Sequence, residues 1–120
     1  MLEKINILGT DYKIEKHKVS EDSLLEKNNW VGYCGEYDKL IVVADTKEKD
    51  IFKFETAKER HEYDKEILRH EIVHAFLNES GLSNNTYRAR EGWAKNEEMV
   101  DWIAIQFPKI LKVCKELRII

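Results

Sequence analysis

The feature that most constrains this 120-residue chain is one long uninterrupted helix in its second half. Thr56 and Glu59 match a capping box, in which each side chain satisfies a free backbone donor at the start of a helix. No proline or glycine follows until Gly81, which is suited to the left-handed conformation that commonly ends helices. We therefore predict a helix from Thr56 to Ser80, and the rest of the fold must be built around it.

Two histidines and a glutamate lie within this helix, in the segment "HEIVH" at residues 70–74. Positions four apart on a helix share one face, so the imidazoles of His70 and His74 can bind one tetrahedral cation. Glu71 is adjacent to the first histidine and can reach a metal-bound water without binding the metal itself. This is the position that a general base requires.

The alternative interpretation of this segment is a charged patch on an ordinary helix. Most of the helix circumference is apolar, which predicts a central helix in the fold. The apolar residues are Ile67, Leu68, Ile72, Val73, Phe76 and Leu77. Polar side chains inside such a helix are costly unless something satisfies them, and a metal ion does so. The other two histidines, His17 and His61, have no such spacing and are expected at the surface.

A catalytic zinc ion takes three protein ligands and leaves one position for water, so a third ligand is required. No histidine follows His74 in the sequence, which excludes a third histidine downstream. A carboxylate from another helix remains, and the segment "NEEMVD" at residues 96–101 is the candidate.

H-E-x-x-H followed by N-E-x-x-x-D resembles the gluzincin class of zinc metallopeptidases. The resemblance implies that Glu97 is the third zinc ligand and that Asp101 orients a zinc-binding histidine. Both residues share one helix face, and metal-bound histidines usually donate their other N–H group to a carboxylate. Glu98 is the rival ligand. We favour Glu97 because Glu98 shares its face with apolar side chains more than with Asp101.

Among gluzincins, the chain is most similar to the small ImmA/IrrE-like metallopeptidases of bacterial prophages and mobile elements. The similarity covers residues 32–108 and includes the segments "GYCGEYDKLIVVAD", "LRHEIVHAFL" and "NEEMVDWIAIQFP". It implies a minimal zincin-like domain that hydrolyses peptide bonds with a zinc-bound water, one Zn²⁺ ion and Glu71 as general base. The implied partner is a peptide or protein substrate.

Two further residue sets are candidates for substrate contacts. Peptidases of this type usually add a donor that stabilises the oxyanion, and Tyr87, Arg88 and Arg90 lie between the two site segments. An ordinary turn with solvated arginines is the alternative for that loop. If the strand "LIVVA" at residues 40–44 lies at a sheet edge, a substrate can pair alongside it.

The first half of the chain has strand character and the second half is helical, which predicts an α+β class. Two hairpins are expected, across residues 4–16 and 28–46, with "LIVVA" as a central or well-covered strand. Val100 and Ala104 are small and let the ligand-bearing helix approach the zinc-site helix. Pro108 is expected to break or kink that helix before a short C-terminal helix.

Composition sets the remaining expectations. The length fits a single domain across residues 1–120, and the net charge of −3 comes from acidic and basic residues that are well mixed. Nucleic-acid binding is therefore not expected. No segment has the length and apolar content of a signal peptide or membrane span, and the two cysteines have no paired spacing. A cytoplasmic protein without membrane contact is expected, and its oligomeric state is undefined.

Two other functional hypotheses remain at this point. The chain can be a zinc-stabilised, non-catalytic binding or regulatory module of a phage or mobile element, in which the metal only supports the fold. It can also be a latent enzyme in which residues 113–120 cover the cleft, with Cys114 as a thiolate ligand.

Overall fold

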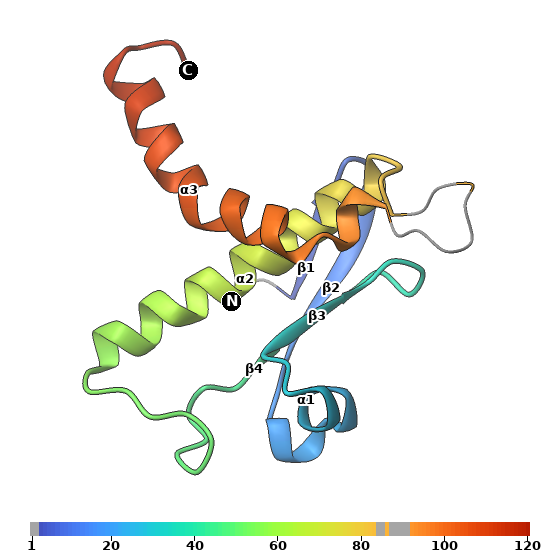
Figure 1. Ribbon diagram of the computed structural model, residues 1–120, viewed down its shortest axis with the longest axis vertical. Coiled ribbons are helices and arrows are strands. Elements are labelled where there is room, and N and C mark those ends of the chain that lie inside the picture. The colour runs from blue at the N-terminus through green and yellow to red at the C-terminus, as the bar shows by residue number, and fades with distance from the viewer. Residues whose placement is uncertain (1–2, 84–85, 87–91) are drawn as a thin grey trace.

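The computed structural model describes residues 3–83, 86 and 92–120. Strands fill the first half of the chain and helices the second, so the α+β expectation is confirmed (Figure 1). The elements in chain order are β1 (Lys4–Ile7), β2 (Thr10–His17), the 3₁₀ turn η1 (Val19–Glu21), α1 (Ser23–Asn28), β3 (Gly32–Gly35), β4 (Leu40–Ala44), α2 (Ala57–Glu79), the 3₁₀ turn η2 (Trp93–Lys95) and α3 (Glu97–Glu116).

The four strands form one mixed sheet in the order β1-β2-β4-β3. Both expected hairpins are present: β1 pairs antiparallel with β2, and β3 pairs antiparallel with β4. Leu8 and Gly9 both have positive φ values, as a two-residue hairpin turn requires, so β2 resumes directly at Thr10. β2 and β4 run parallel in the centre of the sheet.

The position of β4 corrects one expectation. β4 lies between β2 and β3, so the proposal that a substrate pairs alongside "LIVVA" is wrong. Its backbone groups are already paired on both sides, which is why it is the most apolar strand. Within the described part of the chain, β3 is the outer strand on the side of the sheet next to β4.

The sheet is covered differently on its two faces. Alternate residues of a strand point to opposite faces, so Ile41 and Val43 join the cluster that packs under α2. Val42 and Ala44 join a smaller cluster with residues of η1 and α1 on the other face. The strand is therefore buried on both sides and holds the two parts of the core together.

The long helix α2 begins and ends as its sequence predicts. The Thr56 side chain accepts a hydrogen bond from the backbone N–H of Glu59 at 3.1 Å, and Gly81 has a φ of +81° just beyond the end. The end of α2 is also tied to the sheet. Tyr12 donates its hydroxyl to the Glu79 carboxylate at 2.6 Å, and Lys39 Nζ lies 2.8 Å from the same oxygen.

The short C-terminal helix is not a separate element. α3 runs continuously from Glu97 to Glu116 and contains Pro108. Its ribbon changes direction part way along, and its second half projects away from the rest of the molecule (Figure 1). A proline removes one helical hydrogen bond and bends the helix, but the bonds on either side can continue. The expected kink is therefore present without the expected break.

Candidate metal centre

His70 and His74 bring their ring nitrogens together above the sheet. Their Nε2 atoms lie 3.1 Å apart, as expected for side chains one turn apart on α2. His74 is buried and His70 is partly exposed at the cleft. Together with Glu71, they offer ligand atoms that all lie within 4.8 Å of one another. This group can hold a metal ion.

Each histidine is oriented through its other ring nitrogen. His70 Nδ1 donates to Asp101 Oδ1 at 2.7 Å, because a carboxylate can only accept. His74 Nδ1 donates to the backbone carbonyl of Ala94 at 2.5 Å. In the neutral imidazole both protons are thus on Nδ1, which leaves the two Nε2 lone pairs free for a ligand. Burial also lowers the pKa of His74 and favours its neutral form.

Glu97 contacts both histidines from the start of α3. Its two carboxylate oxygens lie 2.9 Å from His70 Nε2 and 3.1 Å from His74 Nε2. Asn96 caps α3 by accepting a hydrogen bond from the Met99 backbone, so the carboxylate is held in the first turn of a defined helix. Glu98 does not reach the histidines. It is exposed and lines a different depression on α3.

The crossing of α2 and α3 is close, as the small residues predict. Val100 and Ala104 are fully or nearly fully buried. The Nε–H group of Arg69 donates to the Ala104 carbonyl at 2.9 Å, which fixes the crossing with a hydrogen bond between the helices. Glu97 and Asp101 are thereby held against the histidine face of α2.

Glu71 lies deeper in the site, with only 3% of its surface exposed. Its Oε1 is 3.9 Å from His70 Nε2, and its Oε2 has no hydrogen-bond partner among the described residues. Burial raises the pKa of Glu71 to about 8, and the nearby charges of Glu97 and Asp101 add to this rise. A buried carboxylate without a partner is costly unless a ligand or a cation compensates it.

β3 makes room for this carboxylate with a glycine. A side-chain carbon at Gly32 would lie 3.2 Å from the Cγ and Oε2 atoms of Glu71 and 3.0 Å from the Val42 carbonyl oxygen. Any larger residue would therefore have to displace Glu71. The absence of a side chain lets β3 pass directly beside the buried carboxylate.

A cleft of about 310 Å³ opens on this side of the crossing. The loop between α1 and β3 and the histidine face of α2 form its walls. Its lining residues are Asn29, Trp30, Val31, Gly32, Tyr63, Glu66, Ile67, His70, Glu71, Glu97 and Asp101. Two of the candidate metal ligands, His70 and Glu97, therefore line an open cleft, and His74 is buried behind them.

The donor set fits a divalent metal ion. Two Nε2 lone pairs and the Glu97 oxygens face one another at about 3 Å, which is unfavourable for acceptors unless a cation or protons lie between them. Among the described residues, no lysine or arginine forms an ion pair with Glu71, Glu97 or Asp101. A bound cation would balance these carboxylates and favour the ionised form of Glu71.

Two groups of predicted residues are not part of the described site. Tyr87, Arg88 and Arg90 lie outside the described residues. Residues 113–120 do not cover the cleft, because the second half of α3, which carries Cys114, projects away from the molecule (Figure 1). The expectation of a covering C-terminal segment is therefore wrong.

Sequence reasoning missed the Ala94 carbonyl. Its position depends on packing: the Ala94 N–H group donates to the Leu82 carbonyl at 2.9 Å, just beyond α2. Gly92 allows this contact, since a side-chain carbon there would lie 2.1 Å from the Leu82 oxygen. A backbone acceptor has no residue signature, although a glycine two residues earlier was a usable signal of close chain approach.

No protein-family model, curated protein or solved structure matches this chain. Among its described residues, none of the helices is both long enough and apolar enough to cross a membrane.

Proposed function

We propose that this chain is a zinc-dependent metallopeptidase of the gluzincin type, similar to the small ImmA/IrrE-like proteins of prophages and mobile elements. The observation that carries the proposal is the convergence of four groups from two helices. The Nε2 atoms of His70 and His74 face the Glu97 carboxylate, and the unpartnered Glu71 carboxylate lies beside them in an open cleft.

In this proposal, His70, His74 and Glu97 hold one Zn²⁺ ion. Nitrogen and oxygen donors suit zinc, and three protein ligands are typical of its catalytic sites. Asp101 and the Ala94 carbonyl keep the two imidazoles in the tautomer that presents Nε2. When bound, zinc supplies a Lewis acid that lowers the pKa of water and polarises a peptide carbonyl.

Glu71 acts as the general base. It accepts a proton from the attacking water as the water oxygen bonds to the scissile carbonyl carbon. It then delivers that proton to the amine nitrogen as the C–N bond breaks. Its place supports this role, because the carboxylate lies beside the proposed zinc ligands and its Oε2 has no hydrogen-bond partner among the described residues. A purely structural metal site has no need for such a group.

Metal content and hydrolysis test the proposal together. The purified protein should bind one zinc ion per chain by mass spectrometry of the metal, and should cleave members of a mixed peptide library. Chelation should abolish cleavage, and zinc should restore it. Glu97→Gln should lower zinc affinity, whereas Glu98→Gln is the matched control on the same turn. Loss of zinc with Glu98→Gln alone would reject Glu97 as the ligand.

Zinc binding without any hydrolysis would instead favour the non-catalytic alternative. In that case the metal should raise the unfolding temperature, and no zinc-dependent product should form from any peptide in the library.

A further inference from the structure

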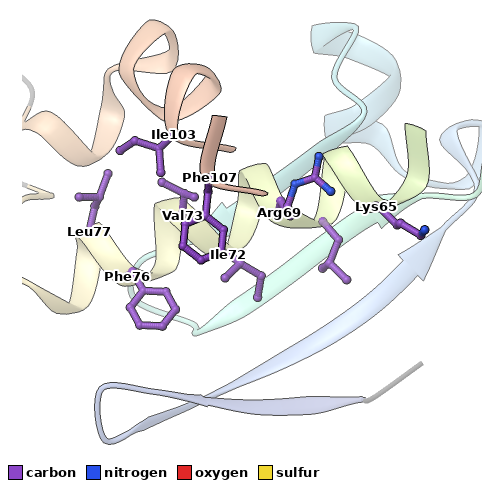
Figure 2. Close-up of a pocket in the computed structure, with 9 residues that line it drawn as sticks. Lys65, Arg69, Ile72, Val73, Phe76, Leu77, Ile103 and Phe107 are labelled. Atoms are coloured by element: carbon purple, nitrogen blue, oxygen red, sulfur yellow. The ribbon is translucent and has the colours of Figure 1, made fainter. Parts of the chain in front are cut away.

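The crossing of α2 and α3 has a second concave side that the proposed function does not use. Residues two apart on a helix point in roughly opposite directions, so Ile72 and Phe76 face away from His70 and His74. Between them and α3 lies a groove of about 700 Å³, in which side chains of the two helices face each other (Figure 2). It is lined by Lys65, Leu68, Arg69, Ile72, Val73, Phe76, Leu77, Ile103 and Phe107.

Large apolar side chains in this groove are open to solvent. Phe76 is 43% exposed and Phe107 is 51% exposed. The radius of gyration of the chain is 15.5 Å, whereas a compact domain of this length has about 13.5 Å. Contiguous exposed apolar surface of this kind marks an interaction site. The α2 residues that line it span Lys65 to Leu77, about 18 Å along the helix axis, which matches about three turns of a docked helix.

The charged side chains at the groove indicate what charge a binding partner should carry. Among the described residues, the charged side chains that line it are both basic, Lys65 and Arg69, and they lie toward one end (Figure 2). A smaller depression at that same end shares Lys65 and adds Lys16 and Asp64. Lys65 also lies 3.1 Å from Glu62, but both side chains are well exposed and such pairs contribute little. Among the described residues, this end of the groove therefore carries more basic than acidic side chains, in a chain whose net charge is negative.

A second copy of the chain fits these charges poorly. The unpartnered second half of α3 is the obvious candidate to enter the groove of a neighbour, and it is itself basic. Between Pro108 and its end at Glu116, it carries Lys109, Lys112 and Lys115 against one acidic side chain, Glu116. Placing it beside Lys65 would bring like charges together. A flat membrane surface fits poorly as well, because the apolar residues line a concavity.

We propose that this groove docks an amphipathic helix of a partner protein, with its apolar face against Ile72, Phe76 and Phe107 and its acidic residues beside Lys65 and Arg69. The helix-in-groove mode needs apolar side chains on one face and complementary charge at the rim, and both are present. The proposal does not depend on catalysis at the metal centre.

Two designed peptides of 14 residues test this with the full zinc-loaded chain. Both carry leucine and isoleucine at helical spacing. One has glutamate at its outward positions and the other has lysine. Fluorescence anisotropy should show that the acidic peptide binds at least about tenfold more tightly, with a preference that falls as salt rises. Phe76→Asp should abolish binding, and Lys65→Glu should remove the charge preference.

Trp102→Asp is the matched control, because Trp102 is 58% exposed and lines a different depression on α3. It should leave both affinities unchanged. Equal binding of the two peptides, or full binding by Phe76→Asp, would overturn the proposal. A dimer in analytical ultracentrifugation that Phe76→Asp dissociates would assign the groove to a second copy. Phe76-dependent binding to anionic phospholipid vesicles would assign it to a membrane. Either result would overturn the proposal.

Glu71→Gln should bind the acidic peptide as well as the wild type does. This variant separates the two proposals, because the groove proposal stands or fails whether or not the chain hydrolyses peptides.

Discussion

The two sides of the α2–α3 crossing are made by the same two helices and have opposite chemistry. One side holds two histidines and three carboxylates, with Glu71 almost completely buried. The other side holds aliphatic and aromatic side chains that are partly exposed. Glu71 and His74 are thus buried where apolar groups are expected, and Phe76 and Phe107 are exposed where polar groups are expected. In both places the usual pattern is inverted, which is typical of surfaces that bind something.

This difference also shows which part of the crossing is structural. Val100 and Ala104, at the contact between the two helices, are buried as in an ordinary core. A substitution on either side should therefore affect one function alone, whereas a substitution in the line of contact should affect both.

The largest expected effect is on the metal side. Glu71→Gln keeps the size of the side chain and removes the base, so hydrolysis should fall about 10²–10⁴-fold. Zinc content and peptide binding at the groove should be unchanged, since Glu71 touches neither the groove nor a second helix. Product formation by mass spectrometry measures the loss. Retention of the wild-type rate would reject Glu71 as the base.

The next largest effect concerns Asp101, which orients His70 and is not itself a proposed metal ligand. Asp101→Asn leaves a side chain of the same shape but a weaker acceptor for His70 Nδ1, so zinc affinity should fall about 10–100-fold. Competition with a chromogenic chelator measures this affinity. Glu98→Gln removes a charge from the same helix without touching a histidine, and an equal loss in that control would show that only net charge matters.

A substitution where α2 and α3 pack together should affect both sides of the crossing at once. Ala104→Leu adds volume where α3 packs on α2, which should lower the free energy of unfolding by about 1–3 kcal/mol in urea titrations. Zinc affinity and groove binding should both weaken. Ile105→Leu is the control on the exposed face of the same turn. If Ala104→Leu weakens only zinc binding or only groove binding, the two sides of the crossing do not depend on the same helix contact.

The smallest expected effect is a pH dependence of stability that arises at His17, which lines neither the cleft nor the groove. Tyr33 and His17 both contact the Asp22 carboxylate, at the start of the helix that precedes the cleft wall. The hydrogen bond to Asp22 raises the pKa of His17. Protonated His17 therefore favours the folded state. Its contribution is complete below the unfolded pKa of about 6.5 and is lost as pH rises through the higher folded pKa.

NMR titration of the His17 ring should show that its pKa falls in Asp22→Asn. The variant should also lose the stability difference between pH 6 and pH 8 that this histidine gives the wild type. No histidine lines the groove among the residues that the structure describes, so its peptide affinity should not follow this titration. A groove affinity that changes with the His17 pKa would show that the groove is coupled to this distant histidine.

The sequence predicted the local features well, because they depend on residues close together in the chain. The helix from Thr56, its end at Gly81 and both hairpins follow from capping and turn chemistry. The approach of Glu97 and Asp101 to His70 followed from helix periodicity and a family resemblance. The apolar run of β4 predicted its central position, but its parallel pairing with β2 was not predicted, since pairing between distant strands leaves no local pattern.

The apolar surface of α2 was the main misinterpretation. A helix that is apolar over most of its circumference predicts burial on every side, yet Phe76 and its neighbours line an open groove. Hydrophobicity alone does not distinguish an apolar face that packs within the chain from an apolar face that stays exposed at the surface. Pro108 showed a similar limit, because its effect on α3 depends on whether the flanking hydrogen bonds survive.

The two histidines are matched in geometry but differ in how mutation can reach them. His70 is oriented by the Asp101 side chain, which a single codon change can delete. His74 is oriented by the Ala94 main-chain carbonyl, which every amino acid at that position would still provide. In a deep mutational scan, position 101 should therefore reject side chains that cannot accept a hydrogen bond. Position 94 should reject only side chains that are too large. Point mutation can thus remove the acceptor that orients His70, but not the acceptor that orients His74.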